Sequence, residues 1–583
     1  MNNPRSVRAR LALSIIAVFA VVVVFGVRLV DIQVVRAAEL SAAAATNRSI
    51  PVTTYGTRGE IVDTDGVVLA DSVDRFDITV SPMDVTDFNR TTDGVTVKVT
   101  VEEALGEIGA ITGQTVEELN APIEAAPDSN FGYLTKGVKL DVYTKVRDLS
   151  IPWVSNELRQ SRTYPNGAVG GNLIGFIGTD GPQAGIELSA DACLASTNGT
   201  STYERGADGV RIPGSTVTAT EPKDGGTVKL TIDRDLQWYA QEALEKQALA
   251  VGADWATALV VRIKDGHLMA VADYPTVDPN DVSSAERTAL GSLAFTAPYE
   301  PGSTFKPMTV ASLLDAGVAT ASDKINVPGI YRVDGGSISD SWDHGDLHLT
   351  TAGIIMNSSN VGISILSERL SAQARHDYMV KFGIGEKTAV DFMYEDGGLL
   401  REASTWDPIT NKAVQFGQGV TATSAQVASI YQTLGNGGVK MPLTLVEGCT
   451  QADGTVIDLP STEGERVVSE YAADETVKMM ETVVTDGWLS NVISIPGYRV
   501  AAKTGTAEVF ENGALTTERI VSVAGVAPAD DPEYAVVVTI GKPDTIKTSG
   551  AAAPTFQQIM TQVLKKYRVV PSSTPATDIP LTW

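Results

Sequence analysis

The feature that most limits how this chain can fold is an apolar run near its N-terminus, LALSIIAVFAVVVVFGV, which covers residues 11–27 without a charge. Arg28 follows, and two more apolar residues extend the run to residue 30. Because an arginine can extend its charged end towards the lipid–water interface, about 20 residues are available to cross a bilayer core. The sequence therefore predicts a transmembrane helix at residues 11–30.

The residues around this run predict its orientation. Residues 1–10 carry three arginines and no acid, which is typical of a tail that stays in the cytoplasm. The alternative is a cleaved signal peptide, since RAAELSAAAA after the run offers small residues for cleavage. The run is longer than the apolar core of a signal peptide, about 7–15 residues, which favours an uncleaved single-span anchor in the cell membrane. In either case we expect the rest of the chain outside the cytoplasm.

The charge balance and the metal-binding residue types exclude some functions. The 583 residues carry a formal net charge of −26, and so acidic a surface argues against nucleic acid, because phosphate binding requires a basic face. The histidines and cysteines form no HExxH motif or Cys/His cluster, so neither a metal nor a cofactor is expected. Cys193 and Cys449 are consistent with either two buried thiols or one disulfide.

Beyond the anchor, the pattern predicts a multidomain α+β protein with two large parts. Residues 31–215 predict an irregular module of short strands and helices, in which TVEEALGEIGAITGQTVEELNAPIEAA forms two short amphipathic helices. At Val228–Ile232 a strand leads into a long helix at about 235–250. Helical and strand segments then alternate, which predicts a second domain at residues 216–568.

The last part of this domain predicts antiparallel strands. YRVAAKTGTAEV and RIVSVAGVAP are strand-like and are joined through Asn512-Gly513, a strong hairpin signal; EYAVVVTIGKP supplies a third strand. A helix with one apolar face follows Pro554. Residues 569–583 are rich in proline, serine and threonine, and they predict a disordered tail.

The stretch YEPGSTFKP contains the first candidate catalytic residues. Pro301-Gly302 can turn the chain into a helix, which places Ser303 and Lys306 on one face. A serine hydroxyl needs a base within hydrogen-bond reach, and a lysine is such a base when burial or a nearby cation lowers its pKa. Alone this tetrad is a weak signal, because a solvated pair has the same spacing.

Two further elements follow in a fixed order. MNSSNVG provides Ser358 and Asn360, and AAKTGTAEV provides Lys503-Thr504-Gly505 on a predicted strand. The order S-x-x-K, S-x-N, K-T-G is the signature of proteins that form a penicilloyl-serine. The three elements together predict that Ser303 is the acylated nucleophile and Lys306 its base.

The residue types on the predicted strand suit substrate binding. Lys503 adds a positive charge that helps to keep Lys306 neutral and attracts a substrate carboxylate, to which Thr504 offers a hydroxyl. Gly505 has no side chain, so that a substrate backbone can lie along the strand.

The remaining groups suit proton transfer and charge stabilisation. Ser358 can relay a proton between the lysine and a leaving amine, and Asn360 can hydrogen-bond a substrate amide. The backbone N–H groups of Ser303 and Thr506 are expected to form the oxyanion hole.

With these motifs in place, the chain resembles a class B penicillin-binding protein, the monofunctional D,D-transpeptidase of peptidoglycan synthesis, over residues 48–566. The resemblance extends to RGEIVDTDGVVLA, RTYPNG, GFIG and GIE in the first module, and to LTIDRDLQ, HGDLHLTTAGIIMNSSNVG and VQFGQGVTATSAQVA in the second. Ala502 stands where the family often has glycine, and we expect it to be tolerated. The single anchor and the serine motifs resemble the septal division type more than the elongation type.

This resemblance implies a membrane anchor, an extracytoplasmic pedestal of the dimerisation type and a transpeptidase domain. The latter has a five-stranded antiparallel sheet flanked by helices, plus an all-helical subdomain. It implies that the penultimate D-Ala of a stem pentapeptide acylates Ser303, that a neighbouring stem's amine completes the cross-link, and that β-lactams acylate the same serine. A membrane glycan polymerase and other division proteins are the implied partners.

Two other functions share the three motifs. A penicillin-binding sensor or scaffold would acylate without cross-linking, but such sensors usually carry several membrane spans or a signalling domain. A D,D-carboxypeptidase would pass the acyl group to water, against which the pedestal and the N-terminal position of the anchor argue.

Several other residues have simpler interpretations. Glu395 lacks the E-x-x-L-N pattern of a deacylating glutamate, so we interpret it as a structural loop carboxylate. Arg58, Asp63 and Glu187 are expected to be salt-bridge partners within the pedestal. His344 and Trp488 are candidates for the neighbourhood of the cleft, with core packing as the alternative for Trp488.

Overall fold

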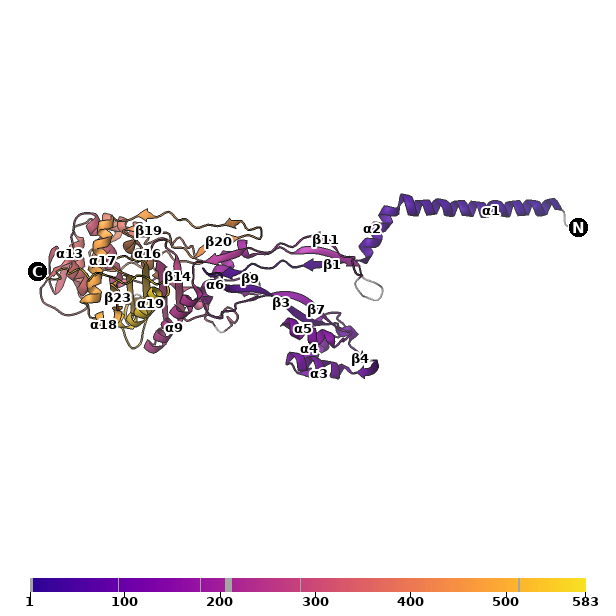
Figure 1. The fold of residues 1–583 in the computed structure, drawn as a ribbon, viewed down its shortest axis with the longest axis horizontal. Helices are drawn as coiled ribbons and strands as arrows, with labels where there is room; N and C mark the ends of the chain where they lie inside the picture. The colour runs from indigo at the N-terminus through magenta and orange to yellow at the C-terminus, as the bar shows by residue number, and fades with distance from the viewer. Residues whose placement is uncertain (1–3, 93, 179, 205–211, 284, 512–513) are drawn as a thin grey trace. The chain divides into compact units, whose positions relative to one another are not determined.

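The structure, a computed structural model, describes residues 4–92, 94–178, 180–204, 212–283, 285–511 and 514–583 (Figure 1). Contacts between residues divide the chain into two compact units, Met1–Thr57 with Ser196–Asp224, and Arg58–Ala195 with Gly225–Trp583. The predicted boundary at residue 215 therefore does not coincide with a boundary between these units.

The first unit contains the apolar helix. Helix α1 (Pro4–Val30) continues through a π-helical turn (Asp31–Val35), and Val7–Val35 is long and apolar enough to cross a membrane. After α2 (Ala37–Arg48), β1 (Ser49–Thr54) pairs with β10 (Gly199–Glu204), which pairs with β11 (Val217–Thr220), both antiparallel.

The second unit begins with a small α/β module, and the part of it around α3 and α4 has a core of its own. Helices α3 and α4 are the two predicted amphipathic helices, and each starts with a capping box, Thr100 with Glu103 and Thr115 with Glu118. Their apolar faces bury Leu105, Ile108 and Leu119 against the strands of the module. The helices and strands are β2 (Ile61–Val62), β3 (Val68–Val80), β4 (Phe88–Thr92), β5 (Val95–Val99), α3 (Val101–Thr112), α4 (Val116–Ala125), β6 (Gly132–Val138), α5 (Leu140–Asp148), β7 (Val154–Thr163), α6 (Gly171–Ile174), β8 (Ile177–Gly178), β9 (Gly181–Pro182), α7 (Gly185–Ser189) and α8 (Asp191–Leu194).

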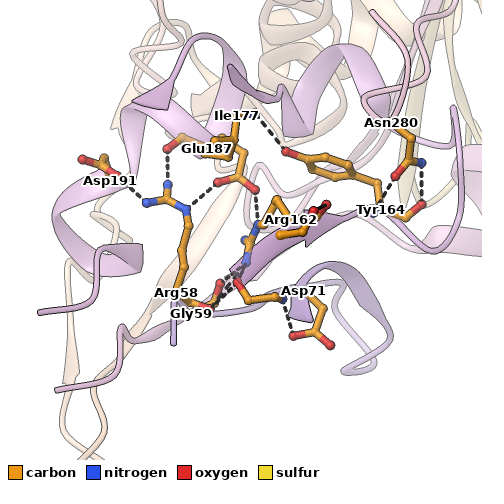
Figure 2. Close-up of polar contacts among 11 residues, drawn as sticks. Arg58, Gly59, Asp71, Arg162, Tyr164, Ile177, Glu187, Asp191 and Asn280 are labelled. Carbon is orange, nitrogen blue, oxygen red and sulfur yellow. Dashed lines mark hydrogen bonds and ion pairs between the residues drawn. The ribbon is translucent and has the colours of Figure 1, made fainter. Parts of the chain in front are cut away.

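A buried ion-pair network joins the segments of this module (Figure 2). The Glu187 carboxylate is fully buried and accepts from Arg58 Nε at 2.9 Å and from Arg162 Nε at 2.6 Å. Arg58 also reaches Asp191, and Arg162 donates to the carbonyl of Gly59 at 2.7 Å. Arg58 and Glu187 are thus structural ion-pair partners, as the sequence predicted. The third predicted partner, Asp63, instead accepts from the backbone N–H groups of Asp65 and Val67.

We expect Glu187→Gln to lower the free energy of unfolding by about 3 kcal/mol, because it leaves two largely buried arginines without their shared counter-charge. Urea unfolding of the detergent-solubilised protein measures the change. The matched control is Asp191→Asn, whose carboxylate is 42% exposed, and we expect it to cost less than about 1 kcal/mol. Equal losses in the two variants would contradict the assignment of Glu187 as the centre of the network.

One sheet combines strands from both sides of the predicted boundary. Its order is β21-β20-β12-β2-β3-β6, and β7 also pairs with β3. Strand β12 (Thr227–Leu230) pairs in parallel with β2 and antiparallel with β20 (Val446–Thr450). Beside it, Cys193 and Cys449 form a disulfide, which decides between the two states left open for these cysteines.

The second large element of this unit is a five-stranded antiparallel sheet in the order β14-β13-β25-β24-β23. Alternate residues of β13 face opposite cores: Ala256, Ala258 and Val260 pack with α9 and α19, whereas Leu259 and Val261 pack in the core that contains α11 and α16. Both faces are therefore covered by helices, as predicted. Strands β23 and β24 pair antiparallel, and the predicted hairpin residues Asn512-Gly513 lie outside the described residues.

Further helices pack on one side of this sheet and carry part of the site. They share the larger apolar core with α16. The helices and strands from residue 227 onwards are β12, α9 (Arg234–Val251), β13 (Trp255–Arg262), β14 (Leu268–Tyr274), α10 (Leu293–Thr296), α11 (Lys306–Asp315), β15 (Lys324–Val327), β16 (Ile330–Val333), β17 (Gly336–Ser339), β18 (Leu347–Thr350), α12 (Thr351–Asn357), α13 (Asn360–Ser367), α14 (Ala372–Lys381), α15 (Pro408–Ala413), α16 (Ser424–Gly435), β19 (Val439–Lys440), β20, β21 (Val456–Ile457), β22 (Glu465–Arg466), α17 (Glu470–Thr485), α18 (Ser490–Ile493), β23 (Ala501–Glu511), β24 (Ala514–Ala527), β25 (Tyr534–Gly541) and α19 (Ala553–Lys566).

The segment 569–583 corrects one prediction. Its composition predicts disorder, but Val569 is buried, and Pro580 and Leu581 accept hydrogen bonds from Thr350. Composition misled the prediction because a few apolar residues and backbone carbonyls are enough to anchor a segment on a surface that is already folded.

Candidate active site

Ser303 lies on a tight turn at the start of α11. Gly302 adopts a φ of 56°, which a side chain would disfavour, and a 3-10 turn (Gly302–Phe305) leads directly into the helix. Pro307 stands at the beginning of α11, where its missing N–H costs no helical hydrogen bond. This turn leaves Ser303 partly exposed at a cleft while the residues on either side of it are buried.

Lys306 is fully buried and is held by the S-x-N motif. Its Nζ donates to the Ser358 carbonyl and to Asn360 Oδ1 at 2.8 Å, and lies 3.3 Å from Ser358 Oγ. Ser358 caps α12 in the left-handed conformation, with a φ of 59°. That bend directs both its carbonyl and its hydroxyl towards the lysine.

Lys503 approaches the same serine from β23. Its side chain is also fully buried, and Nζ lies 2.8 Å from Ser358 Oγ and 3.1 Å from the Thr504 carbonyl. The Ser358 hydroxyl therefore lies between two amines. When it accepts from Lys503, its own proton is free to be donated to Lys306 or to a bound ligand.

Burial shifts both lysines towards their neutral forms. Desolvation lowers the pKa of Lys503 to about 7. Desolvation, and then the charge of Lys503, hold the pKa of Lys306 well below its usual range, while Asp340 partly opposes this shift. A neutral Lys306 that donates to Ser358 and Asn360 keeps its lone pair for accepting a proton.

Gly505 lies in a crowded part of the site. A Cβ at this position would lie 2.5 Å from Ser522 Oγ, 3.0 Å from Thr304 Cγ2 and 3.2 Å from the Pro301 carbonyl. The missing side chain thus makes room for the nucleophile turn. Gly505 also lines the cleft, and its contact with a substrate backbone stays a prediction. A Cβ at Gly302 would likewise lie 3.2 Å from the Thr506 carbonyl, so the backbones around Ser303 and Thr506 are close neighbours.

These groups line a cleft of about 750 Å³. Ser303, Ser358, Asn360, Thr504, Gly505 and Thr506 all contribute to its wall. Trp488 lines it too and is 68% exposed, which selects the cleft over core packing for this residue. Among the described residues, no group of His, Cys, Asp or Glu side chains could hold a metal ion.

Sequence reasoning missed Asp340, which supports the S-x-N motif. Its buried carboxylate accepts from the backbone N–H of Val361 at 2.9 Å and lies 3.1 Å from His344 Nε2. His344 therefore contacts Asp340, which in turn lines the cleft. An acid and a histidine four residues apart in a serine-rich loop are the sole signal in the sequence, and they do not predict this pairing.

Glu395 lies in a loop of its own. Its carboxylate accepts from the backbone N–H groups of Thr388 at 2.9 Å and Phe392 at 3.2 Å. These contacts fit the structural interpretation that the sequence suggested.

The burial of Lys503 predicts a pH-dependent stability. Between pH of about 7 and 10.5, the lysine is protonated in the unfolded chain but neutral in the folded protein, so the free energy of unfolding rises with pH across that window. Below a pH of about 7 the lysine is protonated in both states, and the folded protein then carries the full free-energy cost of burying its charge. We therefore expect Lys503→Met to raise the thermal midpoint at pH 7, and by less at pH 9.5. A gain that is the same at both pH values would contradict this assignment.

Comparisons with known families identify the family to which this chain belongs. The family model "Penicillin binding protein transpeptidase domain" matches residues 256–561, and "Penicillin-binding Protein dimerisation domain" matches residues 53–230. The chain belongs to the penicillin-binding protein family. Both matched segments agree with the resemblance stated from the motifs, and the α+β architecture with its N-terminal apolar helix fits it.

Relatives of this penicillin-binding protein match it over almost its whole length. It is 31% identical to "Penicillin-binding protein PbpB" of Mycolicibacterium smegmatis over 97% of this chain and 91% of that one. It is 32% identical to "Peptidoglycan D,D-transpeptidase FtsI" of Escherichia coli over 91% and 87%.

Solved structures show the same fold. A peptidoglycan synthetase from Bifidobacterium adolescentis matches with a TM-score of 0.72 and 31% identity, over 92% of this chain and 100% of that one. Penicillin binding protein 3 of Mycobacterium tuberculosis, solved with aztreonam, matches with a TM-score of 0.69 and 25% identity, over 91% and 100%.

Proposed function

We propose that this penicillin-binding protein is a serine-type peptidoglycan D,D-transpeptidase that cross-links stem peptides through an acyl-enzyme on Ser303. The observation that carries the proposal is a connected set of hydrogen bonds beside a cleft that Ser303 lines. Lys306 contacts Ser358 and Asn360, and Lys503 contacts the same Ser358 hydroxyl. The names of the relatives, which include a D,D-transpeptidase, support the same reaction.

In the acylation step, neutral Lys306 takes the proton of Ser303 as its Oγ attacks the carbonyl carbon of the penultimate D-Ala. The backbone N–H groups of Ser303 and Thr506 stabilise the oxyanion. The C–N bond to the terminal D-Ala then breaks, and Ser358 passes a proton from Lys306 to the leaving amine. Lys503 and Thr504 hold the carboxylate of that D-Ala, and Asn360 binds a substrate amide.

In the second step, the amine of a neighbouring stem peptide attacks the ester carbonyl and loses a proton to Lys306. The C–O bond to Ser303 then breaks, and Lys306 returns the proton to Ser303 Oγ. The product is a new peptide bond between two stems. A β-lactam presents a similar carbonyl to Ser303, and its ring opens to give a stable ester. Under this proposal, the substrate and the inhibitor react with the same serine in the same cleft.

The membrane arrangement belongs to the same proposal. The Val7–Val35 helix anchors the chain with its arginine-rich N-terminus in the cytoplasm and its other domains outside. Glycan strands come from a membrane polymerase, and other division proteins recruit the enzyme to the septum. The septal role is consistent with the FtsI names of several relatives.

The test is cross-linking by the full-length protein in detergent or liposomes, supplied with lipid-linked pentapeptide precursor and a glycan polymerase. Digestion and mass spectrometry should reveal dimeric muropeptides and one released D-Ala per cross-link, and penicillin should suppress both. Release of D-Ala without dimers would identify a carboxypeptidase. Penicillin acylation with neither product would identify a sensor or scaffold.

A further inference from the structure

The segment 569–583 contacts the entrance to the K-T-G strand. Ser572 N donates to the Gly497 carbonyl at 3.0 Å, and Arg499 N donates to Ser572 Oγ at 3.0 Å. Arg499 also donates from its guanidinium to Thr574 Oγ1 at 3.1 Å, and Tyr498 Oη donates to the Val569 carbonyl at 2.8 Å. These contacts hold the residues that lead into β23, on which Lys503 and Thr504 lie.

The same segment then contacts the start of α12. Thr350, which caps this helix, donates from Oγ1 to the Pro580 carbonyl at 2.6 Å and from N to the Leu581 carbonyl at 3.1 Å. A Cβ at Gly353 would lie 1.9 Å from the Leu581 carbonyl, so glycine allows this close approach. Helix α12 ends at Ser358.

An aromatic anchor secures this second contact. Trp583 N donates to the His348 carbonyl at 3.2 Å, and the two rings meet edge to face with centroids 4.9 Å apart. Lys324 Nζ lies 5.2 Å from the centre of the Trp583 ring, at cation–π distance. Together these contacts attach Trp583 to β15 and β18, the strands that precede α12.

The chain between the two contacts is short. From Thr574 to Pro580 a fully extended backbone spans at most about 22 Å. The segment therefore limits how far the entrance of β23 can move from the start of α12. Lys503 Nζ and Ser358 Oγ, which lie on these two elements, are 2.8 Å apart, and a small separation of the elements would break this contact.

We propose that residues 569–583 form a clasp that holds β23 and α12 together and so positions Lys503 against Ser358. The clasp rests on the proposed function, because positioning matters only if these groups act on a bound acyl donor. Its residues are positioning residues, since none of them lines the cleft. Loss of the clasp should slow acylation without removing the nucleophile.

The experiment compares variants of the full-length protein in detergent. Leu581→Ser/Trp583→Ser removes the apolar side chains that hold this end of the segment in place. An insertion of six Gly/Ser residues between Thr577 and Asp578 keeps both contacts but lengthens the tether. Trp583→Phe is the conservative variant, and Thr577→Ala, at an exposed position, is the control. Stopped-flow kinetics with a fluorescent penicillin separate its dissociation constant from the acylation rate constant, and amide exchange reports on residues 351–358.

We expect the acylation rate constant to fall at least tenfold in the double variant and at least threefold in the insertion variant, with full labelling of Ser303 at long times. Amide exchange at 351–358 should rise in the double variant alone, and Trp583→Phe and Thr577→Ala should match the wild type. An unchanged acylation rate in both altered proteins overturns the clasp. If wild-type protein forms no adduct, the proposed function fails, and unchanged amide exchange in the double variant then overturns the clasp as well.

Discussion

Replacing Ser303 with alanine is expected to abolish the covalent adduct with penicillin, from about one adduct per protein to none. The hydroxyl is the group that forms the ester, so no neighbouring residue can replace it. Intact-mass spectrometry after labelling with a fluorescent penicillin measures the change directly. The buried lysines and the cleft wall are untouched by this substitution, so we expect the thermal midpoint to change little.

A second serine in the same cleft provides the matched control. Ser341 is exposed and lines the cleft near Asp340, and Ser341→Ala should be labelled to the same extent as the wild type. Peptide mapping of the labelled wild type should place the adduct on the tryptic peptide that contains Ser303. An adduct that persists in Ser303→Ala, or that maps elsewhere, would falsify the assignment of the nucleophile.

Lys306→Met is expected to lower the acylation rate constant by about 10²–10⁴-fold, the usual contribution of a general base. Methionine is apolar and of similar length, so it fits a site from which the lysine is already fully shielded. In the wild type, the acylation rate should rise with pH as Lys306 loses its proton, with a midpoint well below 10.5 because burial and Lys503 lower its pKa. The residual rate of the variant should lack that rise.

Stopped-flow kinetics from pH 5 to 10 test both statements. Lys264→Met, at an exposed position on the same domain, is the control for loss of a surface charge and should retain the wild-type profile. A wild-type midpoint near 10.5 would mean that the pKa of Lys306 is not lowered in the folded protein. It would also remove the physical basis for its role as the base.

The nucleophile turn could be predicted from sequence because its geometry is local. Lys306 is the third residue after Ser303, and a helical start places residues at this spacing on one face whatever the rest of the fold does. The two short capped helices at 101–125 were predictable for the same reason, since each capping box lies within four residues. Features that depend only on the spacing of neighbouring residues can therefore be predicted from one sequence.

The contacts between distant segments could not be predicted in the same way. Lys503 and Ser358 are 145 residues apart, and their expected meeting depended on the family signature, not on periodicity. Asp340 has no such signature, and its support of Val361 emerges only when the loop is folded. The crowding around Gly505 could not be predicted, because the atoms close to its missing side chain come from Pro301, Thr304 and Ser522.

The disulfide has a topological consequence. Cys193 and Cys449 are separated by 256 residues, so together they close the chain into a covalent ring. The ring contains the S-x-x-K and S-x-N motifs, whereas the K-T-G strand and the membrane helix extend from it as two free arms. One peptide-bond cleavage inside the ring leaves the molecule in one piece, while one outside it, at residues 450–500, releases the K-T-G arm. Limited proteolysis resolved with and without reductant should therefore divide nicked molecules into these two classes.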